Sequence, residues 1–294
     1  MTQRKDHIDL QGYLLLLACC VFWGFQQVLV KATMPEIPPV MQAAMRFAGA
    51  TALLWLWCQW RGIALADKDG SGWPGVLAGV LFAGEFAALY IGLQQTAASR
   101  LTVFLYTAPF WVAALLPMFV PAERLRAVQW VGLACAFAAV VFALWGGLHT
   151  TGAPWWGDAL GLGAGMLWGL TTVVIRSSTL ARISPEKLLM YQVGVSAVLL
   201  PCLSWGLGEN WAVQWSVFST ASLLIQTVLG AFVSYLAWMW MLGRYPAAKM
   251  SAFVFLTPVV SLAAGALWLQ EAITPSLVWA VALVGVGIVL VNKK

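Results

Sequence analysis

The chain has 294 residues, of which 62% are hydrophobic and only 9% are charged, and its formal net charge is +5. Soluble domains are about 45–50% apolar and about 25% charged, so the composition excludes an ordinary soluble protein and indicates an integral membrane protein. The basic residues lie at the ends of apolar segments, so the positive charge does not indicate a nucleic-acid partner.

Ten apolar segments, separated by short polar or Pro- and Gly-containing breaks, follow one another along the chain. A bilayer core about 30 Å thick needs about 20 apolar residues per helix. The first segment follows Arg4 and Lys5 as in a signal peptide, but its apolar run continues to Val30, which is too long for a cleaved signal. The predicted transmembrane helices are residues 11–32, 39–60, 74–95, 100–120, 126–146, 157–177, 185–207, 216–243, 246–269 and 274–292.

The Lys and Arg residues predict the orientation of these helices. With the N-terminus in the cytoplasm, all 16 lie on the cytoplasmic side except Lys31, Arg100 and Arg46, and Arg46 falls within the second helix. Loops rich in Lys and Arg stay in the cytoplasm. The sequence therefore predicts a multi-pass protein of a bacterial inner membrane, with both termini in the cytoplasm.

Two stretches of the first half recur in the second half. CVFWGFQQVLVK at residues 20–31 aligns with GMLWGLTTVVIR at residues 165–176. TAASRLTVFLYTAPF at residues 96–110 aligns with YPAAKMSAFVFLTPV at residues 245–259. The alignments pair several non-aliphatic residues, namely Trp23 with Trp168, Arg100 with Lys249, and Pro109 with Pro258, and at a similar spacing Glu123 with Glu271.

Each half would hold five helices, an odd number, so the second half must enter the membrane in the opposite orientation. We therefore expect an all-α membrane protein of ten transmembrane helices, built as two inverted five-helix repeats at residues 11–146 and 157–292. Inverted repeats in transporters support alternating access around a site near the membrane midplane. Pro109 and Pro258 should kink helices 4 and 9 at matching positions, which suits hinges.

The paired features resemble two EamA domains of the drug/metabolite transporter superfamily, over nearly the whole chain. They are a Trp-Gly pair in the first helix of each half, a proline within helices 4 and 9, and the glutamates that follow. Arg46 in MRFAGATALLWL also matches the Arg-Phe start of the second helix of such domains, whereas its second-half counterpart, Tyr191, departs from it. The Trp-rich composition further resembles YddG-type exporters of aromatic amino acids. The resemblance implies a central cavity lined by helices 1, 3, 4, 6, 8 and 9, with helices 5 and 10 peripheral.

Nothing in the sequence predicts an enzyme. The two histidines, His7 and His149, lie in the N-terminal tail and in a loop, and no glycine-rich phosphate-binding motif is present. The five cysteines fall in apolar segments without the spacing of metal ligands. We expect no catalytic residue, no metal and no cofactor.

The candidate substrate-binding residues are polar or aromatic and lie near mid-depth on the helices implied to line the cavity. Each aromatic residue alone suits ordinary packing, whereas the set suits a flat apolar substrate whose amino and carboxyl groups are hydrogen-bonded. The set comprises Trp23, Gln27, Glu85, Phe104, Tyr106, Trp168, Thr172, Ser234, Tyr235 and Phe253.

Arg46 and Glu85 are the two charges well inside the predicted membrane region. Their predicted depths differ by about three residues, or roughly 4.5 Å along a helix. One interpretation is an ion pair, direct or through water, that joins helices 2 and 3. The other places Glu85 in the cavity, where it would meet a substrate ammonium or exchange protons, since ionisable groups within a membrane are functional candidates.

The resulting hypothesis is an inner-membrane exporter of small amphipathic metabolites, with aromatic and other apolar amino acids first, acting by alternating access. One alternative is a broad exporter of drugs or quaternary amines, which an aromatic cage and one acid would bind. Alternatives of another class are a passive channel and a non-transporting membrane scaffold. The sequence leaves open the exact substrate, proton coupling and the oligomeric state.

Overall fold

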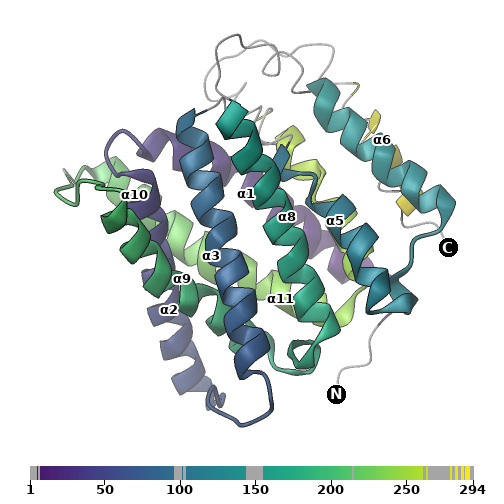
Figure 1. The fold of residues 1–294 in the computed structure, drawn as a ribbon, viewed down its shortest axis with the longest axis horizontal. Helices are drawn as coiled ribbons and strands as arrows, with labels where there is room; N and C mark the ends of the chain where they lie inside the picture. The colour runs from purple at the N-terminus through teal and green to yellow at the C-terminus, as the bar shows by residue number, and fades with distance from the viewer. Residues whose placement is uncertain are drawn as a thin grey trace.

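The computed structural model describes residues 5, 7–95, 101, 104–143, 155–213 and 215–260, and residues 263, 279, 282–283, 286–287 and 289–291. Throughout this part of the chain the regular elements are helices, with no strand (Figure 1). The predicted tenth helix (274–292), the end of the ninth and the start of the fourth lie mostly outside the described residues.

Five described helices are long and apolar enough to cross a membrane. They are Leu10–Thr33, Gly72–Gln95, Trp155–Ser177, Pro185–Gly206 and Val217–Arg244. Shorter apolar helices run over Ala108–Met118, Ala127–Ala138 and Ala247–Val260. The helix Pro39–Arg61 has the required length but is more polar, and two of its polar residues, Gln42 and Arg46, are buried inside the bundle.

The described elements of the first half begin and end close to the predicted boundaries, apart from the interrupted fourth helix. They are α1 (Leu10–Thr33), α2 (Pro39–Arg61), α3 (Gly72–Gln95), α5 (Ala108–Leu115) and α6 (Ala127–Ala143). Asp9 caps α1 by accepting from the Gly12 N–H at 2.9 Å. The start of α2 is capped from a distant loop, because the Glu209 carboxylate accepts from the N–H groups of Val40 and Met41.

The second half contains α8, α9, α10, α11 and α12. Their bounds are Trp155–Ser177, Pro185–Gly206, Val217–Ile225, Tyr235–Arg244 and Ala247–Phe253. Between α10 and α11 the chain continues as a π-helix over Gln226–Ser234, so the predicted eighth helix (216–243) is one long helix with a wider central part. π-helical insertions within α-helices are frequently found at functional sites.

The fourth and ninth predicted helices are both interrupted a few residues before a proline. The first interruption is at Tyr106–Thr107, ahead of Pro109, and the second is at Val254–Phe255, ahead of Pro258. A proline has no N–H to donate to the carbonyl four residues earlier and its ring crowds that carbonyl, so a continuous helix is disfavoured there.

The most extensive contacts join helices of different halves. In Figure 1, α3 and α8 run side by side through the middle of the bundle, and α3 and α2 both pack on α9. The helix α6 lies at one edge, next to the end of the chain. There Gln129 Nε2 donates to the Val291 carbonyl at 2.8 Å.

Glycines allow the closest of these approaches. A Cβ at Gly165 on α8 would lie 2.7 Å from the Leu105 carbonyl oxygen, and a Cβ at Gly79 on α3 would lie 2.5 Å from the Tyr191 carbonyl oxygen on α9. Small residues let transmembrane backbones pack closely in this way. The packing therefore brings the interruption at Tyr106 against α8 and holds α3 between α8 and α9.

Polar contacts tie together what we call the N-terminal end of the bundle, where α1 and α12 begin and α8 and α11 end. Arg176 at the end of α8 forms a buried ion pair with Glu123 and donates to the Leu242 carbonyl at 2.6 Å. Glu123 in turn accepts from the Ala248 N–H at 3.4 Å. These bonds connect the segment after α5 with three elements of the second half.

Candidate functional site

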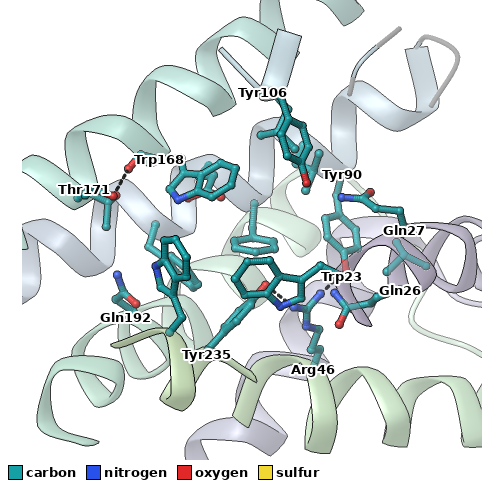
Figure 2. Close-up of a pocket in the computed structure, with 18 of the residues that line it drawn as sticks. Trp23, Gln26, Gln27, Arg46, Tyr90, Tyr106, Trp168, Thr171, Gln192 and Tyr235 are labelled. Atoms are coloured by element: carbon teal, nitrogen blue, oxygen red, sulfur yellow. Dashed lines mark hydrogen bonds between the residues drawn. The ribbon is translucent and has the colours of Figure 1, made fainter. Parts of the chain in front are cut away.

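A cavity lies inside the bundle between α1, α2, α3, α8, α9, α11 and the interruption at Tyr106 (Figure 2). The empty space between its side chains amounts to about 870 Å³, counting the part open to solvent. The lining residues are Trp23, Gln26, Gln27, Val30, Arg46, Phe82, Glu85, Phe86, Leu89, Tyr90, Leu93, Leu105, Tyr106, Trp168, Thr171, Thr172, Ile175, Gln192, Tyr235, Trp238, Met239 and Leu242.

Aromatic rings form most of the apolar wall. The Trp23 ring meets Tyr235 and Trp238 edge-on, with centroids 6.1 and 5.5 Å apart. The Tyr106 ring meets Trp168 edge-on, with centroids 5.9 Å apart (Figure 2). Edge-to-face pairs at these distances are favourable. They fix the rings and leave apolar surface facing the cavity.

The orientation of Trp23 is also set by a hydrogen bond. Its indole N–H donates to the Ser234 hydroxyl at 2.8 Å, and that hydroxyl donates to the Gly230 carbonyl at 2.6 Å. Ser234 and Gly230 both lie in the π-helix. Gly230 has no side chain, which leaves room for the Gln26 amide beside it.

Arg46 is the buried cation of the cavity, with 1% of its surface exposed. Its Nη1 donates to the Tyr90 hydroxyl at 3.3 Å and its Nη2 to the Tyr235 hydroxyl at 2.5 Å. With the Gln26 amide oxygen facing the guanidinium, Nη1 and Nη2 donate to it at 3.0 and 3.2 Å. The Nε–H has no acceptor among the described residues.

Three aromatic rings surround the Arg46 guanidinium. Its Cζ lies 5.2 Å from the centroid of Phe47, 5.3 Å from Phe86 and 5.3 Å from Tyr235. Within about 6 Å such rings attract a cation, more strongly when it is desolvated. The guanidinium is thus held by neutral groups, and in the described part of the chain it forms no ion pair.

Glu85 is the buried carboxyl group of the same cavity and is 6% exposed. Its Oε2 atom is buried and has no hydrogen-bond partner among the described residues. Glu85 and Arg46 both line the cavity, yet they are not among the pairs within ion-pair distance of each other in the described structure. The guanidinium and the carboxyl group therefore share one cavity without an ion pair between them.

Other polar groups complete the lining. Gln192 of α9 is 1% exposed, and its side-chain oxygen has no partner within the described residues. The hydroxyls of Thr171 and Thr172 donate to carbonyls of their own helix, at Leu167 and Trp168. No group of three or more His, Cys, Asp or Glu side chains in the described ranges is placed to hold a metal ion.

Most of the residues chosen from the sequence are brought together in this cavity. Those in its lining are Trp23, Gln27, Arg46, Glu85, Tyr106, Trp168, Thr172 and Tyr235. Ser234 lies behind Trp23, and Phe104 contributes its carbonyl as the acceptor of the Thr107 hydroxyl. The Phe253 ring packs on Tyr13 instead, with centroids 5.8 Å apart.

Sequence reasoning missed Tyr90, Gln192 and Trp238. Tyr90 follows Glu85 and Phe86 on the same helical stripe, so the spacing i, i+4 could have found it. Gln192 is adjacent to Tyr191, the second-half counterpart of Arg46, but the resemblance did not place the seventh helix at the cavity. The described cavity is lined by residues of the second and seventh helices, through Arg46 and Gln192, and by none from the ninth.

Comparison with known proteins agrees with the apolar helices of the structure, since a family of membrane transporters matches the chain twice. The model of the EamA-like transporter family matches residues 10–145 and again residues 155–293. The chain belongs to the EamA-like transporter family. The family lies in the drug/metabolite transporter superfamily, so this is a multi-pass membrane transporter fold.

Relatives within the EamA-like family cover nearly the whole chain. An uncharacterized transporter of Bacillus subtilis, YvbV, is 28% identical over 287 residues, covering 96% of this chain and 91% of the relative. A probable amino-acid metabolite efflux pump of Salmonella typhimurium is 26% identical over 280 residues, covering 92% and 89%. A solved crystal structure of another protein has a TM-score of 0.80 at 18% identity over 94% of both chains, a likeness of fold alone.

Proposed function

We propose that this EamA-family protein exports small amphipathic metabolites across a bacterial inner membrane, with aromatic and other apolar amino acids as its first substrates. The observation that carries the proposal is one cavity that joins an aromatic wall to a buried guanidinium, that of Arg46, and a buried carboxyl group, that of Glu85. The aromatic wall suits an apolar side chain, and the two charges suit its polar groups. The relative named as a probable amino-acid metabolite efflux pump supports the same substrate class.

The proposed mechanism is alternating access by two inverted five-helix repeats, residues 11–146 and 157–292, with both termini in the cytoplasm. The two matches to the family model support the repeats, and the Lys and Arg distribution supports the orientation. The interruptions ahead of Pro109 and Pro258 support hinges at equivalent positions of the two halves. In this mechanism the halves rock around the cavity, which opens to one side of the membrane at a time.

A broad exporter of quaternary amines is the second candidate, favoured by the rings of Trp23, Tyr235 and Trp238 together with Glu85. Aromatic rings and one carboxylate bind such cations well. The Arg46 guanidinium argues against it, because an organic cation in this cavity would meet a second buried positive charge.

Counterflow in liposomes tests the proposal. Proteoliposomes preloaded with unlabelled Phe, Trp, Leu or Thr should take up the labelled amino acid with saturation, whereas a passive channel gives linear flux and no counterflow. A panel of quaternary amines is run in parallel. If no labelled amino acid exchanges, the amino-acid assignment is lost, although the family membership stands.

The Trp168→Ala variant links the flux to the cavity. Loss of an apolar wall side chain is worth about 1.5–3 kcal/mol, so we expect KM to rise by about tenfold or more. The matched control is Trp205→Ala, because Trp205 is 80% exposed and lies outside the cavity lining. Equal effects of the two substitutions would remove the cavity from the transport path.

A further inference from the structure

We infer that Arg46 and Glu85 form the two poles of a zwitterion-binding site, in which Arg46 takes an α-carboxylate and Glu85 takes an α-ammonium. The inference rests on the proposed amino-acid substrate and defines what the cavity requires of it. The ligand class is an α-amino acid with both groups free and an apolar side chain against the aromatic wall.

The surroundings of Arg46 support one part of this inference, the binding of the α-carboxylate. A buried guanidinium is normally paired with an anion, because taking a charge out of water costs several kcal/mol. Here the acceptors are the neutral oxygens of Tyr90, Tyr235 and Gln26, and the Nε–H has none within the described residues. These contacts and three rings hold the guanidinium in place, and no carboxylate of the described residues lies within ion-pair distance of it.

A carboxylate ligand would supply what Arg46 lacks. The planar guanidinium presents its N–H groups in a fixed fork that matches the two oxygens of a carboxylate, and such charge-assisted bonds are about twice as strong as neutral ones. The neutral acceptors orient the fork without neutralising it. Arg46 is therefore organised as a carboxylate receptor before any ligand arrives.

The surroundings of Glu85 support the other part of the inference, the binding of the α-ammonium. It lies on α3, its neighbour Phe86 places a ring 5.3 Å from the Arg46 Cζ, and its Oε2 has no partner in the described structure. An unsatisfied buried carboxylate oxygen is costly in a membrane. An ammonium group has three donors and one positive charge, so it would satisfy this oxygen and neutralise the carboxylate.

The absence of a direct bond between the two residues decides what fits between them. An ion pair would have cancelled both charges and left no requirement for a charged ligand. With Arg46 and Glu85 apart in one cavity, a cation alone pairs with Glu85 and is repelled by Arg46, whereas an anion alone pairs with Arg46 and leaves Glu85 Oε2 without a donor. Only a ligand that carries both charges satisfies both poles.

The inference is tested by calorimetric titration of the purified protein with three ligands that share one phenyl side chain. L-phenylalanine carries both charges, phenylalanine methyl ester carries only the ammonium, and 3-phenylpropionate carries only the carboxylate. We expect the wild type to bind phenylalanine about tenfold or more tightly than either analogue, since each lost charge-assisted bond is worth about 1.5–3 kcal/mol.

Two variants assign the poles. Glu85→Gln should bring phenylalanine and 3-phenylpropionate to similar affinity while keeping discrimination against the ester. Arg46→Gln should bring phenylalanine and the ester to similar affinity while keeping discrimination against 3-phenylpropionate. The control is Arg61→Gln at the exposed end of α2, which should keep the wild-type order of all three ligands.

The outcomes separate the inference from the function on which it rests. Similar wild-type affinity for phenylalanine and its ester, or equal weakening of all three ligands by Glu85→Gln, overturns the zwitterion site while leaving amino-acid export in place. Absence of both binding and counterflow for every amino acid overturns the two together. If Arg46→Gln does not fold, Glu85→Gln with the three ligands decides the matter, because Gln replaces Glu with almost the same shape.

Discussion

Ser234 is the residue through which the π-helix orients the cavity wall, since its hydroxyl accepts from the Trp23 indole N–H at 2.8 Å. Removing one partner of a buried hydrogen bond leaves the other unsatisfied, which costs about 1–3 kcal/mol. We therefore expect Ser234→Ala to lower the free energy of unfolding by about that amount and to raise KM for the proposed amino-acid substrate. Thermal unfolding in detergent and counterflow measure the two effects.

Ser177→Ala is the matched control for this change. The Ser177 hydroxyl donates to the Val173 carbonyl of its own helix, and the residue is exposed at the end of α8. Its removal leaves no buried group without a partner, so stability and KM should remain near the wild-type values. If Ser177→Ala lowered the free energy of unfolding as much as Ser234→Ala, the hydrogen bond from the Trp23 indole to Ser234 would not be the cause of the effect.

The individual residues also mark how far the sequence could predict the site. Trp23 and Glu85 stand out in an apolar helix by their chemistry alone, and the repeat leads from Trp23 to Trp168. Gln192 and Phe253 could not be placed in this way, because the face that a transmembrane helix turns inward depends on its neighbours. Phe253 packs on Tyr13, whereas Gln192 points into the cavity.

At the scale of elements, the contact of α8 with the interrupted fourth helix depends on Gly165. A Cβ there would lie 2.7 Å from the Leu105 carbonyl oxygen and 2.7 Å from the Thr107 Oγ1, so α8 would have to move. Overpacking of this kind costs about 1–3 kcal/mol. Gly165→Ala should therefore lower the unfolding temperature, as measured in detergent.

Gly163 on the same helix provides the control, since a Cβ at Gly163 would meet nothing within 4 Å. Alanine is preferred over glycine within a helix by about 1 kcal/mol. Gly163→Ala should thus leave the unfolding temperature unchanged or raise it. If Gly163→Ala lowered the unfolding temperature as much as Gly165→Ala, close packing at Gly165 would not be the cause of the destabilisation.

The loop between α2 and α3 is tied to α9 by a pH-sensitive contact. The Lys187 ammonium donates to the Asp69 carboxylate at 2.8 Å, and this bond, with those from Ser71, holds the pKa of Asp69 below its ordinary value. A pKa lowered by folding adds stability that is present above the unfolded pKa, about 3.9, and is lost as the pH falls through the folded pKa. The difference in unfolding temperature between the wild type and Asp69→Asn should therefore shrink below about pH 4.

Asp67→Asn is the control for this titration. Lys187 bonds to the Asp67 residue through the backbone carbonyl, at 2.9 Å, and this bond does not need the side chain. The unfolding temperature of Asp67→Asn should therefore change with pH as that of the wild type does. A constant difference between the wild type and Asp69→Asn from pH 8 to pH 3 would argue against the ion pair as the source of stability.

Helix boundaries were predictable because they follow from local chemistry. The caps and breaks around α1, α2 and α3 stand in the sequence, and the described ends lie within about two residues of the predicted ones. The π-helix at Gln226–Ser234 was not predictable, because QTVLGAFVS has the composition of an ordinary apolar α-helix. Within this segment Gly230 leaves room for the Gln26 amide of α1, a tertiary contact that the composition of the segment does not predict.

For the whole molecule, the decisive contacts run between the two halves of the chain. Arg176 belongs to the second half and Glu123 to the first, and their ion pair joins the halves at the N-terminal end of the bundle, where Arg176 also donates to the carbonyl of the cavity residue Leu242. Breaking one partner of a buried pair costs about 3–5 kcal/mol. In the proposed alternating-access mechanism, loss of the Arg176–Glu123 pair would mainly destabilise the state in which the N-terminal end of the bundle is closed.

Glu123→Gln should therefore favour the state in which the N-terminal end is open. Leu242→Cys, placed in a background with Cys135 and Cys202 replaced by serine, reports on that opening, because Leu242 lines the cavity and is 1% exposed. A polar thiol reagent should label this cysteine about tenfold or more faster in Glu123→Gln than with Glu123 intact, since a shift of 1.4 kcal/mol changes a population ratio tenfold. Saturating phenylalanine should change the labelling rate in both proteins, because bound substrate shifts the same equilibrium. Equal labelling with and without Glu123, in proteins that remain folded, would mean that the pair only stabilises the fold and that this end does not open during transport.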